Sequence, residues 1–232
     1  MKPEYKTRLV RIWREWISGI LLVIVLTTSF RSAIADWNDV PSGSMIPTIL
    51  EGDRIFVNKL AYDLKFPFTT RHLASWDNPR RGDIVVFYSP ADERRLVKRV
   101  VGLPGDILSM KDNQLLLNGE AISYDSLDPE IMERYAPHPD LVYRFYTETL
   151  GDMKHPVMLT PALPSRRSFD PVRVPERGYF MMGDNRDNSG DSRYFGFVER
   201  DRILGRVVVV VLSVRREDYY LPRWDRFFHS LP

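Results

Sequence analysis

The chain of 232 residues carries a net charge of +2, is 44% apolar and 28% charged, and contains no cysteine. This composition is typical of a globular protein with one sizeable core, and its balanced charge does not indicate a nucleic-acid partner. Without cysteine the chain has no disulfide, no thiolate metal site and no cysteine nucleophile. The histidines, at positions 72, 138, 155 and 229, lack the short spacings of metal ligands, so no metal site is predicted.

The first predicted element is an apolar segment near the N-terminus. Residues 17–30 read ISGILLVIVLTTSF without a charge, and up to residue 35 only Arg31 interrupts the run. As a helix, residues 17–35 would be about 28 Å long, close to the thickness of a bilayer core. The tail 1–16 has an excess of lysine and arginine, which the positive-inside rule places in the cytoplasm. We therefore expect one transmembrane anchor, with the body outside the cytoplasm.

Two alternatives to an anchor remain open. A removable secretory signal also has a basic start, a short apolar run and small residues such as Ala33-Ile34-Ala35. A helix buried in a soluble domain is the other alternative, and the basic flank argues against it. Both the anchor and the signal place the body of the protein outside the cytoplasm.

After residue 35 the pattern changes to short apolar or alternating runs bounded by Gly, Pro, Asn and Asp, which is typical of strands. Asn118-Gly119 predicts a two-residue hairpin, because the favoured turn needs positive φ at both positions. The body is therefore expected to be mostly β, folded as an antiparallel barrel or packed sheets. The predicted strands are 54–60, 83–88, 95–101, 107–117, 179–182 and 203–214.

Two further segments differ from this β pattern. Residues 120–177 are rich in proline and weakly periodic, so we expect an inserted lobe or an extended loop. The catalytic β core would then consist of 36–119 and 178–214. The tail 215–232 is rich in aromatic residues, which favours a contact with a membrane surface, and a tail packed on the body is the alternative.

The first of three segments that can carry chemistry is PSGSMIPT, residues 41–48. The glycine between two serines lets the backbone turn sharply, and the flanking prolines fix its entry and exit. Such a turn can point one hydroxyl outward and aim a second hydroxyl, together with a backbone N–H, at the same place. By itself the segment favours an ordinary loop of Ser, Gly and Pro.

The second segment is RLVKRVV, residues 95–101, followed by GLPGD. In a strand, side-chain alternation places Leu96, Lys98 and Val100 on one face. Lys98 is then the single charge on an apolar face, where burial disfavours the ammonium form and lowers the pKa. A neutral lysine amine is a competent general base near pH 7. A lysine at a strand edge that reaches solvent is the alternative.

The third segment is GDNRDNSGDSR, residues 183–193. A solvated loop and a calcium loop are both conceivable for so polar a run, but the spacing and the terminal glutamate of an EF-hand are missing. We predict a hydrogen-bonded knot in which Asp–Arg pairs hold small groups in place.

Together, and in this order, the three segments resemble the motifs of bacterial type I signal peptidases, the Ser–Lys proteases of peptidase family S26. PSGSMIPT resembles the nucleophile box, RLVKRVVGLPGD the lysine box, and GDNRDNSGDSR the most specific motif of the family. The resemblance covers residues 41–57, 81–106 and 178–210, and the apolar N-terminal segment agrees with it. It implies a mostly β body of signal-peptidase type with one N-terminal transmembrane helix, and neither a metal nor another cofactor.

The resemblance assigns roles position by position. Ser44 would be the nucleophile, and Lys98 the base that takes its proton and then activates water. Ser42 would donate its hydroxyl to the oxyanion beside the N–H of Ser44. Ser189 would orient the Lys98 amine. The rest of the site wall would be formed by Gly183, Asn188, Asp191 and Arg193.

The resemblance also places Met45 and Leu96 at the substrate pocket. The family usually has an aromatic residue two positions before the lysine, where this chain has Leu96. The resemblance therefore leaves the side-chain preference of the pocket undefined.

The function implied by the resemblance is a membrane-bound serine endopeptidase that removes signal peptides from exported preproteins with Ala-x-Ala-like cleavage sites. It would act on the extracytoplasmic side of the bacterial inner membrane, with preproteins and the lipid bilayer as partners. The chain's own Ala33-Ile34-Ala35 would suit such a pocket, so self-cleavage after Ala35 is a further hypothesis.

Three rival functions are weighed against this one. A dedicated conjugation or pilus-maturation peptidase would use the same dyad on another substrate. A self-cleaving repressor would need a DNA-binding segment, and none is apparent. In an anchored β-rich binding protein, the serines and the lysine would be incidental.

Overall fold

The computed structural model describes residues 13–66, 69, 72–128, 135–137 and 140–232. Within these residues the protein is mostly β and antiparallel, as the sequence predicts. The largest sheet has the strand order β1-β2-β16-β5-β6-β14-β15, and β17 and β18 also pair with β16. Its strands are β1 (Ala35–Asp39), β2 (Asp53–Asn58), β5 (Ile84–Tyr88), β6 (Arg95–Gly102), β14 (Gly178–Met182), β15 (Val198–Glu199), β16 (Ile203–Arg215), β17 (Leu221–Pro222) and β18 (His229–Ser230).

Three smaller sheets accompany this main sheet. One has the order β13-β7-β8-β9, one the order β10-β11-β12, and one is the pair β3-β4. Their strands are β3 (Asp63–Lys65), β4 (His72–Ser75), β7 (Ile107–Lys111), β8 (Gln114–Leu117), β9 (Glu120–Ala121), β10 (Ser123–Ser126), β11 (Arg144–Leu150), β12 (Met153–Leu159) and β13 (Phe169–Arg173). The short helical turns are η2 (Gly43–Met45), η3 (Lys59–Ala61), α4 (Ser192–Phe195), η5 (Arg200–Arg202) and η6 (Trp224–Arg226).

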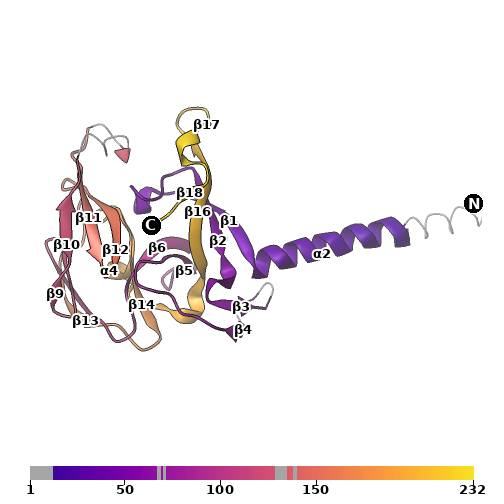
Figure 1. The fold of residues 1–232 in the computed structure, drawn as a ribbon, viewed down its shortest axis with the longest axis horizontal. Helices are drawn as coiled ribbons and strands as arrows, with labels where there is room; N and C mark the ends of the chain where they lie inside the picture. Colours follow the sequence, from indigo (N-terminus) through magenta and orange to yellow (C-terminus); the bar gives the residue numbers. More distant parts are fainter. Residues whose placement is uncertain (1–12, 67–68, 70–71, 129–134, 138–139) are drawn as a thin grey trace, which may run out of the picture.

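The N-terminal helical segment, η1 (Trp13–Ile17) and α2 (Ser18–Ala33), projects away from the sheets (Figure 1). Each apolar side chain from position 20 to position 26 is at least 50% exposed, so the helix is not buried in a soluble core. Among the described residues, no helix is both long and apolar enough to cross a membrane. Residues 1–12 of the expected cytoplasmic tail are not among the described residues. The side chain of Arg31 is not described either.

Strand β1 follows α2 directly. Ala35 pairs with Asn58, and the N–H of Lys59 donates to the carbonyl of Ile34 at 3.0 Å. The connection between the helix and residues 41–48 is therefore a strand of the main sheet and not a free tether. The peptide bond after Ala35 belongs to this ladder, so self-cleavage there would require release of β1.

The predicted strands are confirmed in β2, β5, β6, β14 and β16, with ends that differ by a few residues. The hairpin predicted at Asn118-Gly119 is also confirmed, with φ of 53° and 87° and with β8 paired to β9. The single strand predicted at 107–117 is wrong, because β7 and β8 are joined by a turn at Asp112-Asn113. Both turn residues have positive φ, which short Asp and Asn side chains tolerate.

The proline-rich segment 120–177, here called the lobe, consists of strands rather than an extended loop. It lies on the opposite side of the main sheet from α2 (Figure 1). Strands β10, β11 and β12 form a sheet of their own, whereas β9 and β13 pair with β8 and β7. Sheet pairing therefore continues across both expected boundaries of the lobe.

The C-terminal tail 215–232 is packed on the body through β17, η6 and β18. Arg226 is 4% exposed and pairs with the fully buried Asp53 at 2.6 Å, and Leu231 packs against the core of the main sheet. The tail also presents aromatic side chains that are between 66% and 95% exposed: Tyr219, Tyr220, Trp224 and Phe228. The packed-tail alternative is thus confirmed, and a membrane contact remains a prediction.

Candidate active site

Residues 41–48, here called the nucleophile turn after the role predicted for Ser44, form a tight turn between β1 and β2 that lies against β6. Residues 43–45 make the 3-10 turn η2, in which Ser44 is half-buried and Met45 packs into the core. Ser42 precedes the turn in extended conformation, is exposed, and does not use its side chain to cap the turn. The two hydroxyls of this segment therefore differ in their surroundings, as the Ser-Gly-Ser pattern predicts.

Lys98 reaches this turn from β6. Its side chain is buried, and its Nζ lies 2.6 Å from Ser44 Oγ and 2.9 Å from the carbonyl oxygen of Val97. The fold thus joins two residues that are 54 positions apart in the chain. An uncharged amine at this distance can accept the proton of the serine hydroxyl.

Burial is the main reason why this amine can be uncharged. It lowers the pKa of Lys98 from 10.5 to about 8, against the opposing influence of Asp191 and Asp184. Among the described residues no carboxylate forms an ion pair with Lys98. The two aspartates that influence it are paired with arginines, Asp184 with Arg99 and Asp191 with Arg193. These two pairings limit the stabilisation of the ammonium form.

The segment 183–193 is the hydrogen-bonded knot that its composition predicts. Asp191 is fully buried and accepts hydrogen bonds from Arg193 Nε and Nη2, both at 2.8 Å, and from the N–H of Gly183 at 3.1 Å. Gly183 lies so close to the nucleophile turn that a Cβ would collide with Ser189 Oγ and with the carbonyl oxygen of Ser44. Because Gly183 has no Cβ, the segment 183–193 can lie directly against the nucleophile turn.

Two predicted wall residues have less direct contacts. Ser189 is buried beside Gly183, but its Oγ has no hydrogen-bond partner within the described part of the chain, Lys98 included. Asn188 has an exposed side chain, and its N–H closes a turn to the carbonyl of Asn185. The orientation of the Lys98 amine by Ser189 therefore remains a prediction.

Asn185 contacts the nucleophile turn and was missed in the sequence. Its side-chain Nδ2 donates to the carbonyl of Gly43 at 3.0 Å, and its backbone N–H donates to the carbonyl of Ser44 at 3.1 Å. Asn185 is 1% exposed. The motif contains two asparagines, Asn185 and Asn188, which the sequence alone cannot tell apart. The fold shows that Asn185 reaches the nucleophile turn.

A buried ion pair beside the dyad was also missed. Arg99 Nε and Nη2 bind Asp184 at 2.9 and 2.8 Å, and the hydroxyl of Thr48 donates to the same carboxylate. The pair therefore links β6, the knot and the end of the nucleophile segment. Its sequence signal is the arginine directly after Lys98, which strand alternation alone places on the opposite face.

The predicted pocket residues lie in different hydrophobic clusters. Met45 packs with Ile49, Ile84 and Val86, whereas Leu96 packs against the cluster that contains Phe87 and Val100. No contact between Met45 and a substrate, or between Leu96 and a substrate, follows from these clusters, so their substrate role remains a prediction.

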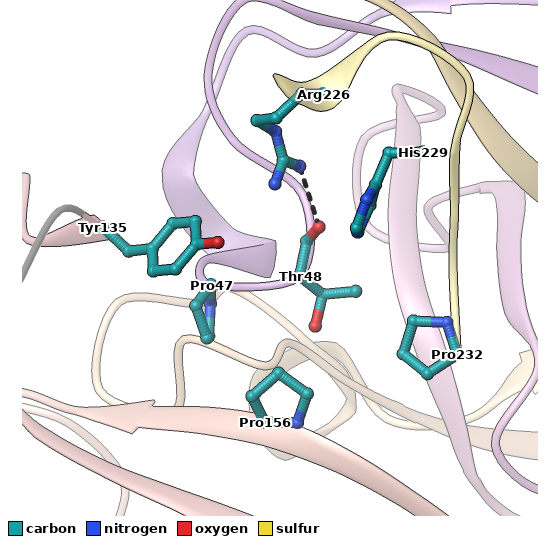
Figure 2. Close-up of a pocket in the computed structure, with 7 residues that line it drawn as sticks. All are labelled: Pro47, Thr48, Tyr135, Pro156, Arg226, His229 and Pro232. Atoms are coloured by element: carbon teal, nitrogen blue, oxygen red, sulfur yellow. Dashed lines mark hydrogen bonds between the residues drawn. The ribbon is translucent and has the colours of Figure 1, made fainter. Parts of the chain in front are cut away.

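A cavity of about 220 Å³ adjoins the end of the nucleophile segment (Figure 2). Across it, Arg226 Nη2 donates to the carbonyl of Thr48 at 3.0 Å, so the C-terminal tail also supports this segment. Neither dyad residue lines the cavity. Its lining residues are Pro47, Thr48, Tyr135, Pro156, Arg226, His229 and Pro232.

A serine hydroxyl next to a buried, weakly basic lysine is the arrangement of a serine hydrolase that uses lysine as its base. Within the described residues no group of acidic or histidine side chains could hold a metal ion. The chain matches the family model of signal peptidase, peptidase S26, over residues 13–212, and it belongs to this family.

Curated relatives agree with this assignment. The chain is 35% identical to signal peptidase I of Pseudomonas fluorescens, with 88% of this chain and 73% of the relative covered. It is 34% identical to signal peptidase I of Bacillus licheniformis, with 88% and 91% covered. A solved structure of a signal peptidase I from Enterococcus faecalis V583 is 32% identical, covers 57% of this chain and 98% of its own, and gives a TM-score of 0.35.

One buried group near the site should make stability depend on pH. His155 Nε2 lies 3.4 Å from Glu148 Oε1 and 3.8 Å from Asp184 Oδ1, and its ring is fully buried. Burial, and then the charge of Arg99, lower the pKa of His155 below its usual 6.5, although both carboxylates oppose this. As the pH falls, His155 is therefore protonated at a higher pH in the unfolded chain than in the folded one.

We accordingly expect the unfolding free energy to decrease below about pH 6.5, by up to about 1.4 kcal/mol per pH unit. Denaturant titrations between pH 5 and 7.5 measure this slope. His155→Gln should flatten it, whereas the exposed control His229→Gln should not. An equal slope in wild type and His155→Gln would contradict this assignment.

Proposed function

We propose that this protein is a membrane-bound serine endopeptidase that removes N-terminal signal peptides from exported preproteins, with Ser44 as nucleophile and Lys98 as general base. The observation that carries the proposal is the buried Lys98 amine 2.6 Å from Ser44 Oγ. Membership of peptidase family S26 supports the substrate class.

In the acylation step, Ser44 Oγ attacks the scissile carbonyl carbon while Lys98 takes the hydroxyl proton. The resulting ammonium gives this proton to the departing amine of the mature protein, and an ester joins the signal peptide to Ser44. Lys98, neutral again, then takes a proton from water, and the hydroxide attacks the ester carbonyl carbon. The ester bond to Ser44 Oγ breaks, the Lys98 ammonium returns its proton to this oxygen, and the signal peptide leaves with a free carboxylate. One amine therefore serves both half-reactions without a metal or cofactor.

The negative oxygen of each tetrahedral intermediate requires hydrogen-bond donors. The exposed hydroxyl of Ser42 and the N–H of Ser44 are the donors proposed here. Gly43 between them permits the sharp turn that both need, and the contacts of Asn185 with the carbonyls of Gly43 and Ser44 hold the turn in place. Preorganised donors of this kind need no rearrangement during the reaction.

The proposed substrate is an extended peptide with small side chains at alternate positions, as in Ala-x-Ala. Such a peptide binds by strand addition and needs only shallow pockets. Met45 and Leu96 are the residues proposed to limit the depth of these pockets.

The direct test is cleavage of a detergent-solubilised preprotein that ends its signal in Ala-x-Ala. Ser44→Ala and Lys98→Met should lower kcat by about 10⁴-fold or more without loss of fold, since each removes one half of the dyad. The matched control Lys111→Met replaces an exposed lysine on β7 and should leave kcat unchanged.

Cleavage by Lys98→Met at the wild-type rate would rule out Lys98 as the base. A folded wild type that cleaves no Ala-x-Ala preprotein would instead favour the dedicated conjugation or pilus-maturation substrate.

The oxyanion role of Ser42 predicts a kinetic defect of defined size. Ser42→Ala should reduce kcat by about 10²–10³-fold, as expected for the loss of one oxyanion donor. Thermal unfolding should not change, because Ser42 is exposed and does not cap η2. A wild-type kcat in this variant would show that Ser42 is only a turn residue, and Ser123→Ala on β10 is the exposed control.

The apolar segment 17–35, of which α2 is the described helix, is proposed to be the membrane anchor, with the catalytic body on the outer side of the bacterial inner membrane. Its exposed apolar side chains and its direct connection to β1 support this placement. Val23→Asp combined with Ile24→Asp should release the full-length protein from carbonate-washed membranes, because each carboxylate costs about 2.5–3.5 kcal/mol in a bilayer centre. The control Val142→Asp changes an exposed residue of the lobe and should stay in the membrane fraction. Recovery of the wild-type protein in the soluble fraction would contradict the anchor.

The aromatic side chains of the tail are proposed to add a second contact with the membrane surface. Trp and Tyr favour the interface between lipid and water, and Trp224 is 73% exposed. In the released Val23→Asp/Ile24→Asp protein, Tyr220→Ser with Trp224→Ser should reduce residual binding to lipid vesicles severalfold. Binding that does not change would leave the tail without this role.

A further inference from the structure

The lobe packs directly against the nucleophile segment. Ile46 and Leu50, which follow Ser44, share a hydrophobic cluster with Phe145 of β11 and Met158 of β12. All four side chains are buried. The position of the catalytic serine is thus determined in part by residues that the sequence assigned to a separable insertion.

Strand β12 also pairs with the knot. The N–H of Met158 donates to the carbonyl of Asp184 at 2.8 Å, and the N–H of Arg186 donates to the carbonyl of Met158 at 2.9 Å. These bonds make a parallel bridge between Met158 and Asn185. Because Asn185 holds the carbonyls of Gly43 and Ser44, a continuous set of hydrogen bonds leads from β12 to the nucleophile turn.

A fully buried ion pair fixes this contact. Arg186 Nη2 lies 2.7 Å from Glu148 Oε1, and Arg186 Nη1 lies 2.6 Å from Glu148 Oε2. The hydroxyl of Tyr124 donates to Glu148 at 2.5 Å. Burial opposes ionisation, but Arg186 and His155 hold the pKa of Glu148 below its usual value. The two parallel contacts with Glu148 fix the orientation of the Arg186 guanidinium group. They thereby restrict the position of the Arg186 backbone.

We propose that Glu148 is a positioning residue for the cleavage reaction: through Arg186 it holds residues 184–186 against the nucleophile turn and keeps Ser44 Oγ within reach of Lys98. The inference rests on the proposed function of the dyad. It assigns a catalytic purpose to the lobe, which supplies Glu148 from β11 and the bridging Met158 from β12.

A purely structural ion pair would change stability without changing the site, so kinetics and local protection must be measured together. In Glu148→Gln, Arg186 is left as a buried charge without its counter-ion, and the adjacent backbone should shift. We expect kcat to fall about 10²-fold with KM within about threefold, the effect of a displacement near 1 Å. Hydrogen exchange of residues 183–188 should accelerate at least about tenfold, with no change in β16.

Two further variants complete the series. Glu148→Gln combined with Arg186→Gln removes both charges of this pair and allows an amide–amide hydrogen bond, so it should recover at least about tenfold of the lost kcat. Tyr124→Phe removes one hydrogen bond to Glu148 and should give a smaller defect of the same kind. Asp125→Asn, an exposed charge change on the neighbouring position of β10, is the control and should behave as wild type.

The experiment uses the full-length protein in detergent, with thermal unfolding as the check on folding. A folded Glu148→Gln variant with wild-type kcat overturns the proposal, and so does a slow variant whose residues 183–188 exchange as in wild type. If Glu148→Gln fails to fold, the double variant Glu148→Gln/Arg186→Gln and the variant Tyr124→Phe are judged by the same two readouts, kcat and hydrogen exchange of residues 183–188. Failure of wild type to cleave any preprotein would refute the proposed function, whereas hydrogen exchange would still test the positioning.

Discussion

The proposed proton transfer from Ser44 to the Lys98 amine near neutral pH depends on the burial of this amine in the fold. The side chain is 2% exposed, and burial is the largest influence that brings its pKa to about 8. A lysine in solution would hold its proton at the same pH and could not act as a base.

A buried amine remains uncharged only if nearby carboxylates are neutralised by other groups. Asp184 and Asp191 both favour the charged form of Lys98, and each is occupied by an arginine at 2.8 Å. Buried ion pairs of this kind are costly to desolvate and contribute little net stability, but breaking one partner is strongly destabilising. Their presence around Lys98 is therefore better explained by positioning and electrostatics than by stability.

The sequence predicted the parts of the site that depend on local pattern. Alternation located β6 and the burial of Lys98, and the Ser-Gly-Ser motif located the turn with Ser44. Local sequence patterns could not predict contacts between segments that are distant in the chain. Asn185 rather than Asn188 reaches the nucleophile turn, and the lobe joins the knot through Met158, because these choices depend on how separate sheets pack.

The same limit explains the errors in the fold. Asp112-Asn113 lies inside an apolar run and lacks the glycine that marked the second hairpin, so one strand was predicted where two exist. Proline concealed the pairing of β11 with β12, in which Pro156 lies opposite Thr147. Periodicity therefore gave β2, β5, β6, β14 and β16 of the main sheet, missed its shorter strands β1, β15, β17 and β18, and failed where turns and prolines interrupt the pattern.

The measurement that tests the account most directly is an NMR titration of the Lys98 side chain in protein with labelled lysine, with Lys98→Met used to assign its signal. We predict that the Lys98 resonance titrates with a midpoint of about 8, well below the usual 10.5. A midpoint near 10.5 would mean that the amine is charged at neutral pH, and Lys98 could not then be the base that activates Ser44.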